Sequence, residues 1–126
     1  MKLRSVALAA TLAGACLLSA CATNTARFEW GGYEGALYAY AKAPDKRPGY
    51  ETALENAIER GRKTNKVAPG LCAELGFAYL EDGDSRRAVV LFEEEMQRFP
   101  ESRSFLTEVV ARAKVATAPA SAESKS

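Results

Sequence analysis

Residues 69–100 constrain the fold more than any other part of this 126-residue chain. No stretch here alternates apolar and polar residues at the period of a strand, and the apolar spacing is helical. The turn-forming run E-D-G-D-S divides the segment into two helices, and Asp84 is well placed to cap the second. Glu94 and Arg98 add an i, i+4 pair of favourable polarity, and Pro100 stops the second helix. The segment therefore predicts a helical hairpin.

The spacing within this hairpin resembles that of one tetratricopeptide repeat. That pattern has Leu-Gly, a tyrosine three residues after the glycine, an alanine nine further on, a phenylalanine four later and a proline after eight more. The matching residues here are Leu75, Gly76, Tyr79, Ala88, Phe92 and Pro100. The resemblance implies that the small residues Gly76 and Ala88 lie where the two helices cross most closely. Cys72 and Glu95 depart from the pattern, which usually has tryptophan and alanine at those positions.

One repeat cannot bury its own apolar face, so neighbouring helices must cover it. Helical spacing predicts a first helix over residues 31–42, whose stripe includes Tyr33, Leu37 and Tyr40, and a second over 48–63. After the hairpin, Ser102 can cap a further helix whose apolar residues would pack back onto the repeat: Phe105, Leu106, Val109, Val110 and Ala113. We therefore expect an all-α fold, a short helical-hairpin (tetratricopeptide-like) solenoid of about five helices, arranged as two pairs and a cap.

The start of the chain has the features of a secretory signal. Lys2 and Arg4 precede an apolar run over residues 6–18, and two small residues then lead to Cys21. The run is too short to span a bilayer, which takes about 20 apolar residues. The alternative, a buried N-terminal helix, would need a polar face that this run lacks.

The sequence L-S-A-C at residues 18–21 resembles the lipobox of bacterial lipoproteins. The resemblance implies that a diacylglycerol is attached to the thiol of Cys21 and that residues 1–20 are cleaved. Cys16 fits less well, because Ala13 stands where the leucine belongs. Each buried methylene contributes about 0.8 kcal/mol, so two or three acyl chains would hold the protein at a membrane. Ala22, rather than aspartate, after the cysteine implies the periplasmic face of the outer membrane in a double-membraned bacterium.

The composition suggests four segments and little catalytic equipment. We expect a cleaved signal at 1–20, a lipidated tether at 21–29, a helical body at 30–115 and a disordered tail at 116–126. The chain has no histidine, which removes the usual general base and the commonest metal ligand. Losing Lys2 and Arg4 leaves 15 basic against 16 acidic residues, so there is no electrostatic case for nucleic acid. We expect no enzyme, no cofactor and no metal.

Three groups of residues have both a functional and a structural interpretation. Glu93 to Glu95 could suggest a metal site, but consecutive helical residues point about 100° apart, so a solvated helix face is favoured. Cys72 could be a nucleophile, but without a histidine base a small core residue is favoured. A basic cluster could suggest nucleic acid, but no aromatic residue is interleaved, so a solvated helix end is favoured. That cluster consists of Arg60, Arg62, Lys63 and Lys66.

Aromatic residues near the start of the body are the candidates for a partner surface. Most of them share the helical stripe and are expected to pack inward. Tyr38 lies off that stripe, so it is the aromatic residue that we expect to be most exposed. The candidate partner contacts are Trp30, Tyr33 and Tyr38.

With its lipobox, its repeat and the run F-E-W-G-G-Y-E-G-A-L-Y-A-Y at residues 28–40, the chain resembles the small bacterial lipoproteins of domain of unknown function 4810. Trp30-Gly31-x-Tyr33 and the following Leu37-Tyr38 carry the likeness. Members of that family are often encoded beside a lipoprotein resembling the curli secretion channel and a second small lipoprotein. The family has no established activity, so the resemblance implies a setting rather than a mechanism.

These observations lead to one principal hypothesis and two alternatives. The principal one is an outer-membrane lipoprotein whose repeat domain binds another envelope protein in assembly or secretion, by analogy the channel-like lipoprotein. The first alternative is an allosteric activator of a periplasmic enzyme such as a peptidoglycan synthase. The second is a protein that binds a small apolar ligand between its helical pairs.

Overall fold

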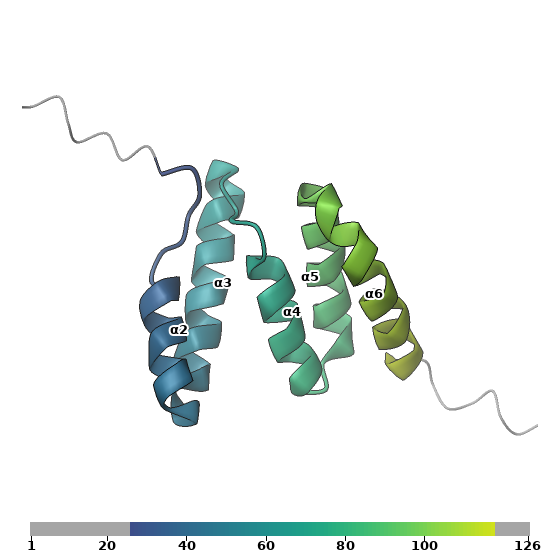
Figure 1. Ribbon diagram of the computed structural model, residues 1–126, viewed down its shortest axis with the longest axis horizontal. Coiled ribbons are helices and arrows are strands. Elements are labelled where there is room, and N and C mark those ends of the chain that lie inside the picture. The colour runs from purple at the N-terminus through teal and green to yellow at the C-terminus, as the bar shows by residue number, and fades with distance from the viewer. Residues whose placement is uncertain (1–25, 118–126) are drawn as a thin grey trace, which may run out of the picture.

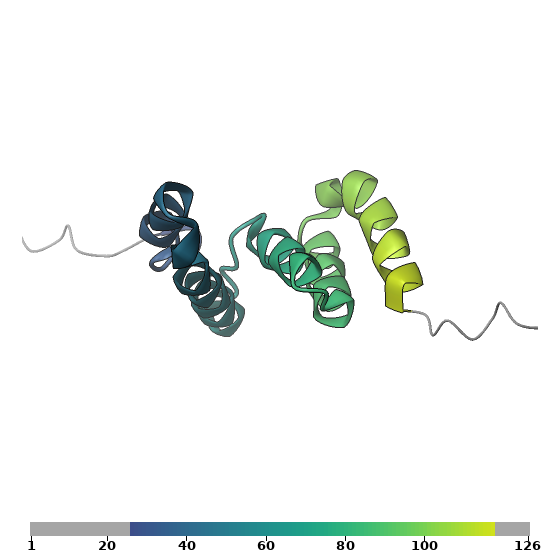
Figure 2. The same ribbon diagram turned by 90° about the horizontal axis from the view of Figure 1, so that it is seen from below.

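The computed structural model describes residues 26–117, which form five α-helices and two short 3₁₀ turns. The helices are α2 (Tyr33–Lys42), α3 (Arg47–Thr64), α4 (Leu71–Glu81), α5 (Ser85–Arg98) and α6 (Arg103–Thr117), with turns η2 (Pro44–Lys46) and η3 (Pro100–Ser102) before α3 and α6. Two antiparallel hairpins, α2–α3 and α4–α5, stand side by side, and α6 packs on α5 (Figure 1). Seen from below, α3 and α5 lie on the opposite side of the row from α2 and α6 (Figure 2). The expected all-α arrangement of two pairs and a cap is confirmed.

The helix ends follow local signals in the sequence. The carboxylate of Asp84 accepts a hydrogen bond of 3.1 Å from the Arg87 N–H, so the predicted cap of α5 is confirmed. The predicted cap by Ser102 is wrong. This residue instead closes η3, and its hydroxyl donates to the Phe99 carbonyl at 2.8 Å. A 3₁₀ turn that begins at Pro100 thus takes the place of a side-chain cap.

The core lies between α3 of the first hairpin and α4 and α5 of the second. Its wholly buried side chains come from all of these helices and include Leu54, Ile58, Leu71, Cys72, Phe92 and, from α6, Leu106. A Cβ added at Gly76 would lie only 2.7 Å from Cε1 of Phe92, so the close helix approach expected there is confirmed. Ala88, the other small residue of the crossing, is also wholly buried.

Both terminal helices bury less apolar surface than the sequence predicts. Phe105 was expected to pack onto the repeat but is 62% exposed, and Leu37 on the expected stripe of α2 is 37% exposed. The reason is position in the row: α2 packs on α3, and α6 on α5, with no further helix on the outer side of either within residues 26–117. Each end helix therefore has fewer neighbours than a middle one.

Glu95 also differs from expectation. A solvated face was expected for residues 93–95, yet the Glu95 side chain is buried beneath the start of α4. Glu94 remains at the surface, where it pairs with Arg98, as predicted, and with Arg62 of α3.

The end of the expected tether belongs to the folded body. The Glu29 N–H donates to the Lys66 carbonyl at 2.8 Å, and Phe28 packs partly against the core. The signal at 1–20 and Cys21 lie outside the described residues, as does most of the tail, although α6 runs two residues past 115 to Thr117. Between residues 26 and 117, no helix is both long and apolar enough to cross a membrane.

Candidate partner-binding surface

Aromatic side chains cross the face that α2, α4 and α6 share. The ring of Phe77 on α4 lies 4.9 Å from the buried ring of Phe92 and 6.2 Å from that of Phe105 on α6. Phe77 also lines a hollow of about 190 Å³ together with Tyr40 and Tyr50. We call Tyr40, Tyr50, Phe77 and Phe105 the aromatic groove, in which the first three residues line this hollow and Phe105 neighbours Phe77 outside it. It presents apolar surface that the fold itself does not cover, because Phe77 and Phe105 are 36% and 62% exposed.

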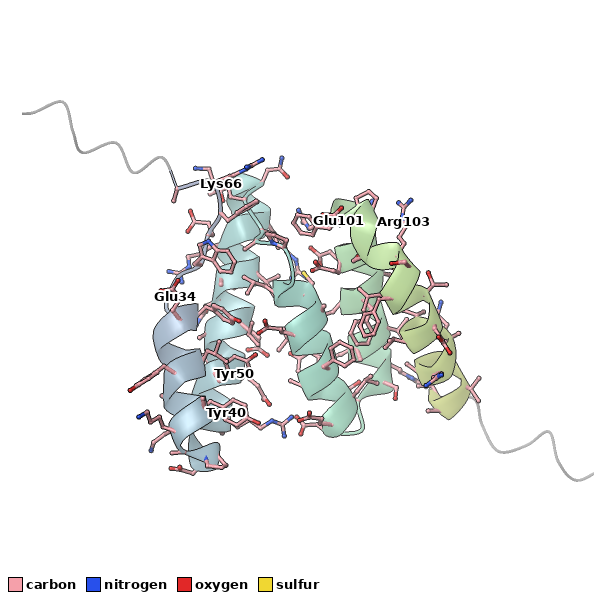
Figure 3. The ribbon with its side chains drawn as sticks, in the orientation of Figure 1. Glu34, Tyr40, Tyr50, Lys66, Glu101 and Arg103 are labelled. Carbon is pink, nitrogen blue, oxygen red and sulfur yellow. The ribbon has the colours of Figure 1, made fainter. Side chains whose placement is uncertain are left out.

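The wall of the groove towards α2 is held by a shared carboxylate. Glu74 of α4 accepts hydrogen bonds from the hydroxyls of Tyr33, at 2.8 Å, and Tyr50, at 2.5 Å. Tyr40 and Tyr50, drawn in Figure 3, stack with ring centroids 5.2 Å apart. Burial, and then the bond to Glu74, raises the pKa of Tyr33 to about 12 and also raises the pKa of Tyr50. Both hydroxyls therefore stay protonated, and keep donating, to a higher pH than an ordinary tyrosine would.

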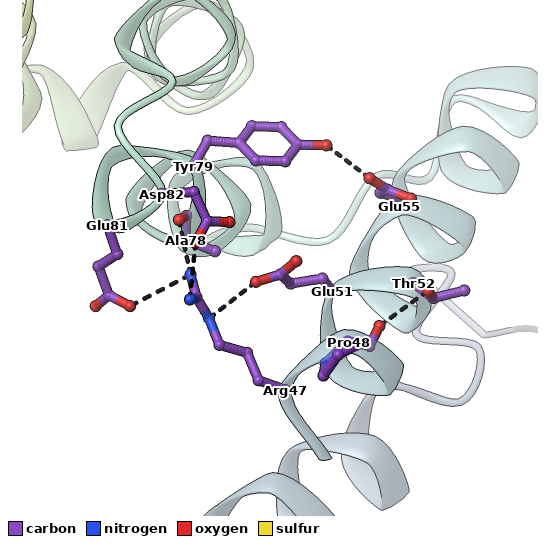
Figure 4. A network of polar contacts seen from close by, with 9 residues as sticks. All are labelled: Arg47, Pro48, Glu51, Thr52, Glu55, Ala78, Tyr79, Glu81 and Asp82. Carbon is purple, nitrogen blue, oxygen red and sulfur yellow. Dashed lines mark hydrogen bonds and ion pairs between the residues drawn. The ribbon is translucent and has the colours of Figure 1, made fainter. Parts of the chain in front are cut away.

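Arg47 closes one end of the groove by joining the two hairpins. Its guanidinium donates to the Asp82 carboxylate at 2.8 Å and to the Ala78 carbonyl at 2.9 Å (Figure 4). It also pairs with Glu51 on its own helix and with Glu81. Because Ala78, Glu81 and Asp82 lie at the C-terminal end of α4, their contacts with Arg47 hold the start of α3 against the second hairpin.

A second hollow of about 560 Å³ lies on the α3 and α5 side of the row. Its polar groups largely satisfy one another: the Tyr79 hydroxyl donates to Glu55 at 2.6 Å, and the guanidinium of Arg87 lies 4.1 Å from the Tyr79 ring centroid. Val90 is the exposed apolar residue on this side, at 63%. The volume of this hollow is larger than that of the hollow lined by Phe77, but no phenylalanine or tryptophan is among its lining residues.

The three aromatic residues proposed from the sequence do not form one cluster. Trp30 is 38% exposed, and its ring centroid lies 5.9 Å from that of the half-buried Tyr33. Tyr38 is 65% exposed, as expected from its place off the stripe, and its ring contacts Lys42. Sequence reasoning missed Phe77. It lies two residues from the buried Leu75, and on a helix that separation turns a side chain to the other face.

Among the described residues, the possible metal ligands do not cluster and the one thiol is buried. No group of three or more His, Cys, Asp or Glu side chains between residues 26 and 117 could hold a metal ion. Burial, chiefly, raises the pKa of the Cys72 thiol to about 12. At neutral pH this wholly buried thiol is therefore protonated and unreactive.

Comparison with known proteins identifies a family whose function is unknown. The model of the family described as domain of unknown function (DUF4810) matches residues 28–109, which include all of α2 to α5, the aromatic groove and the start of α6. No curated protein and no solved structure matches the chain. From this match over most of its length, the chain belongs to the DUF4810 family.

Proposed function

We propose that this protein is a lipoprotein, anchored through Cys21 at the periplasmic face of the outer membrane, whose tetratricopeptide-like body binds another envelope protein. Three features support the proposal. The residues at 18–21 resemble a lipobox, the spacing within α4 and α5 resembles the repeat, and the aromatic groove offers a docking surface.

The exposed pair Phe77 and Phe105 carries the proposal. Fully burying a phenylalanine side chain contributes about 1.5–3 kcal/mol. This fold leaves most of Phe105 and about a third of Phe77 in water. Aromatic side chains at interfaces supply much of the binding energy when a partner covers them. Phe77 packs on the wholly buried ring of Phe92, which holds it in place before any partner binds. A preformed apolar site of this kind loses little conformational entropy on binding.

The family resemblance suggests the partner. The lipoprotein resembling the curli secretion channel, encoded beside family members, would stand in the same membrane. The exposed rings of Phe77 and Phe105 suit a short helix or extended segment of such a partner.

Crosslinking in intact cells, followed by extraction of the protein from membranes, tests the proposal. Mass spectrometry should find acyl chains on Cys21 and a specific co-purifying envelope protein. Phe105→Ser should abolish that co-purification. Val90→Ser is the matched control, because Val90 is equally exposed but lies on the other side of the row. A protein that still begins at Met1, or one that recovers no specific chain with several crosslinkers, would refute the proposal.

The alternative, an allosteric activator of a distant periplasmic enzyme, receives less support. Because Glu29 is held by Lys66, the free tether is shorter than the sequence suggests, and it is too short to carry the body far from the membrane. A flexible insert after Ala22 separates the two hypotheses. An activator that reaches across the periplasm should keep or gain function with the longer tether, whereas a subunit docked at the membrane should lose it.

A further inference from the structure

One end of the molecule gathers basic side chains around the point where the described chain begins. At this end α3 and α5 terminate and α4 and α6 start, and Figure 3 shows Lys66 and Arg103 there. Residues 26–29 lie against the same end through the bond between Glu29 and Lys66. The guanidinium of Arg60 lies next to this segment, beside Gly31. We call Arg27, Arg60, Lys66 and Arg103 the basic pole.

The charges of the basic pole are not neutralised within the fold. In the part of the chain that the structure describes, none of the four pairs with a carboxylate. Arg60 and Arg103 donate instead to backbone carbonyls, and the guanidinium of Arg27 lies over the Phe28 ring. Glu29, whose N–H bonds to Lys66, and Glu101, labelled in Figure 3, share this end. These two carboxylates reduce the positive charge of the four cations without cancelling it.

The other end of the molecule is different. There Arg47 pairs with three carboxylates and Arg87 pairs with Asp84. Lys42 and Arg86 lie near that end and pair with no carboxylate between residues 26 and 117, so they serve below as controls. Cations without a carboxylate partner are therefore concentrated at the basic pole, where the described chain begins.

The length of chain before the body limits how far the basic pole can lie from a membrane that holds Cys21. Six residue steps separate Cys21 from Arg27, and they span at most about 21 Å when fully extended. The 18 residues of α3 extend about 27 Å from the basic pole to the opposite end. A lipid on Cys21 therefore keeps the basic pole within about 21 Å of the headgroups, whereas the opposite end lies about 27 Å further along α3.

We propose that the basic pole rests on the anionic phospholipid headgroups of the bilayer that holds the acyl chains of Cys21. The inference depends on the lipid anchor of the proposed function and adds the orientation of the body. Attraction between the pole and the surface acts at short range, because physiological salt screens charges over about 8 Å. The helices then stand along the membrane normal, so the aromatic groove faces along the membrane. Its partner must present a surface within about 27 Å of the same bilayer, the height of α3.

Energy transfer from the two ends of α3 to the bilayer tests this orientation. The full lipidated protein would be reconstituted into vesicles of phosphatidylethanolamine and phosphatidylglycerol that contain an acceptor dye on a lipid headgroup. A donor dye is placed on Thr64→Cys, at the basic pole, or on Asp45→Cys, at the other end; both positions are exposed and Cys72 is wholly buried. We expect at least two-fold higher transfer from position 64 than from position 45.

Charge reversal identifies the cause. The double variant Arg60→Glu and Lys66→Glu, or high salt, should lower transfer from position 64 towards the value for position 45. The matched double variant Lys42→Glu and Arg86→Glu should leave it unchanged. Equal transfer from both positions, or transfer that is insensitive to reversal of the pole, would overturn the orientation.

Flotation of the same vesicles separates this inference from the lipid anchor. If the protein floats with the vesicles but shows equal energy transfer from positions 64 and 45, the lipid anchor is supported and the orientation is refuted. Protein that does not float overturns both. Correct folding of each variant is checked by its helical circular dichroism and its cooperative thermal unfolding.

Discussion

The carboxylate of Glu95 on α5 accepts a hydrogen bond of 2.7 Å from the backbone N–H of Gly70 at the start of α4. The backbone N–H groups of Cys72 and Ala73 also favour the charged form of this carboxylate. Gly70 has no side chain, so α4 lacks a cap of its own, and an acidic residue from the next helix takes that role at the positive end of the helix dipole. The tetratricopeptide pattern usually has alanine at this position, and here the polar contact joins the two helices of the hairpin.

Glu95 predicts an unusual pH dependence of stability. Burial outweighs its backbone hydrogen bonds and raises its pKa, and one carboxylate oxygen has no partner. Because the folded pKa lies above the unfolded value of about 4.3, the contribution of this group to stability is fully present below that value and is lost as the pH rises through the folded pKa. The free energy of unfolding, measured with denaturant, should therefore depend differently on pH in the native protein and in Glu95→Gln. As the pH falls, the native protein should gain stability relative to the variant.

Glu94 provides the opposite control. Its pKa is lowered, first by the hydrogen bond from Arg62, so its contribution is lost as the pH falls through the folded value. Glu94→Gln should therefore match the native protein more closely in acid than at neutral pH. The same pH trend in both variants would contradict this assignment of the two carboxylates.

The Tyr33 phenol should titrate late. Its pKa of about 12 lies above the ordinary value of about 10, so its stabilising contribution is present below pH 10 and is lost as the pH rises through about 12. Ultraviolet absorbance during alkaline titration should show a late phase that moves to lower pH in Glu74→Gln. Tyr38→Phe, which lies outside this cluster, should leave the late phase in place. A late phase that survives Glu74→Gln unchanged would rule out the shared carboxylate as part of its cause.

The two glycines Gly76 and Gly35 should respond in opposite ways to alanine. At Gly76 the new methyl group meets the buried Phe92 ring, and overpacking costs typically about 1–3 kcal/mol, which exceeds the gain in helix propensity of about 1 kcal/mol. At Gly35 on α2 nothing lies within 4 Å, so alanine should stabilise by about 0.5–1 kcal/mol. Chemical unfolding of both variants measures these changes. Stabilisation by Gly76→Ala would mean that the helices do not cross there as closely as described.

The Cys72 thiol should resist modification in the folded protein. Because it is wholly buried and its pKa is raised to about 12, labelling by a thiol reagent at neutral pH should be on the order of 100-fold slower than in denaturant. Thr64→Cys supplies an exposed thiol in the same chain as a control. Equal rates at the two positions would show that the core around α4 opens readily.

The hairpin of α4 and α5 could be predicted from local sequence because its determinants are local. The polar turn, the Asp84 cap and the Glu94–Arg98 pair each depend on residues within four positions of one another. The burial of Cys72 could also be predicted, because a helix face is set by its periodicity. The aromatic groove could not be predicted, because it depends on which rings the next helix leaves uncovered.

The sequence by itself determined the number of helices, their order, and the small residues Gly76 and Ala88 at the helix crossing. Only the tertiary structure decided that Glu95 is buried, that Phe105 remains in water, and that Arg47 joins the two hairpins. The physical reason is range. Periodicity, caps and turns act over a few residues, whereas the burial of a side chain depends on helices brought beside it from distant parts of the chain.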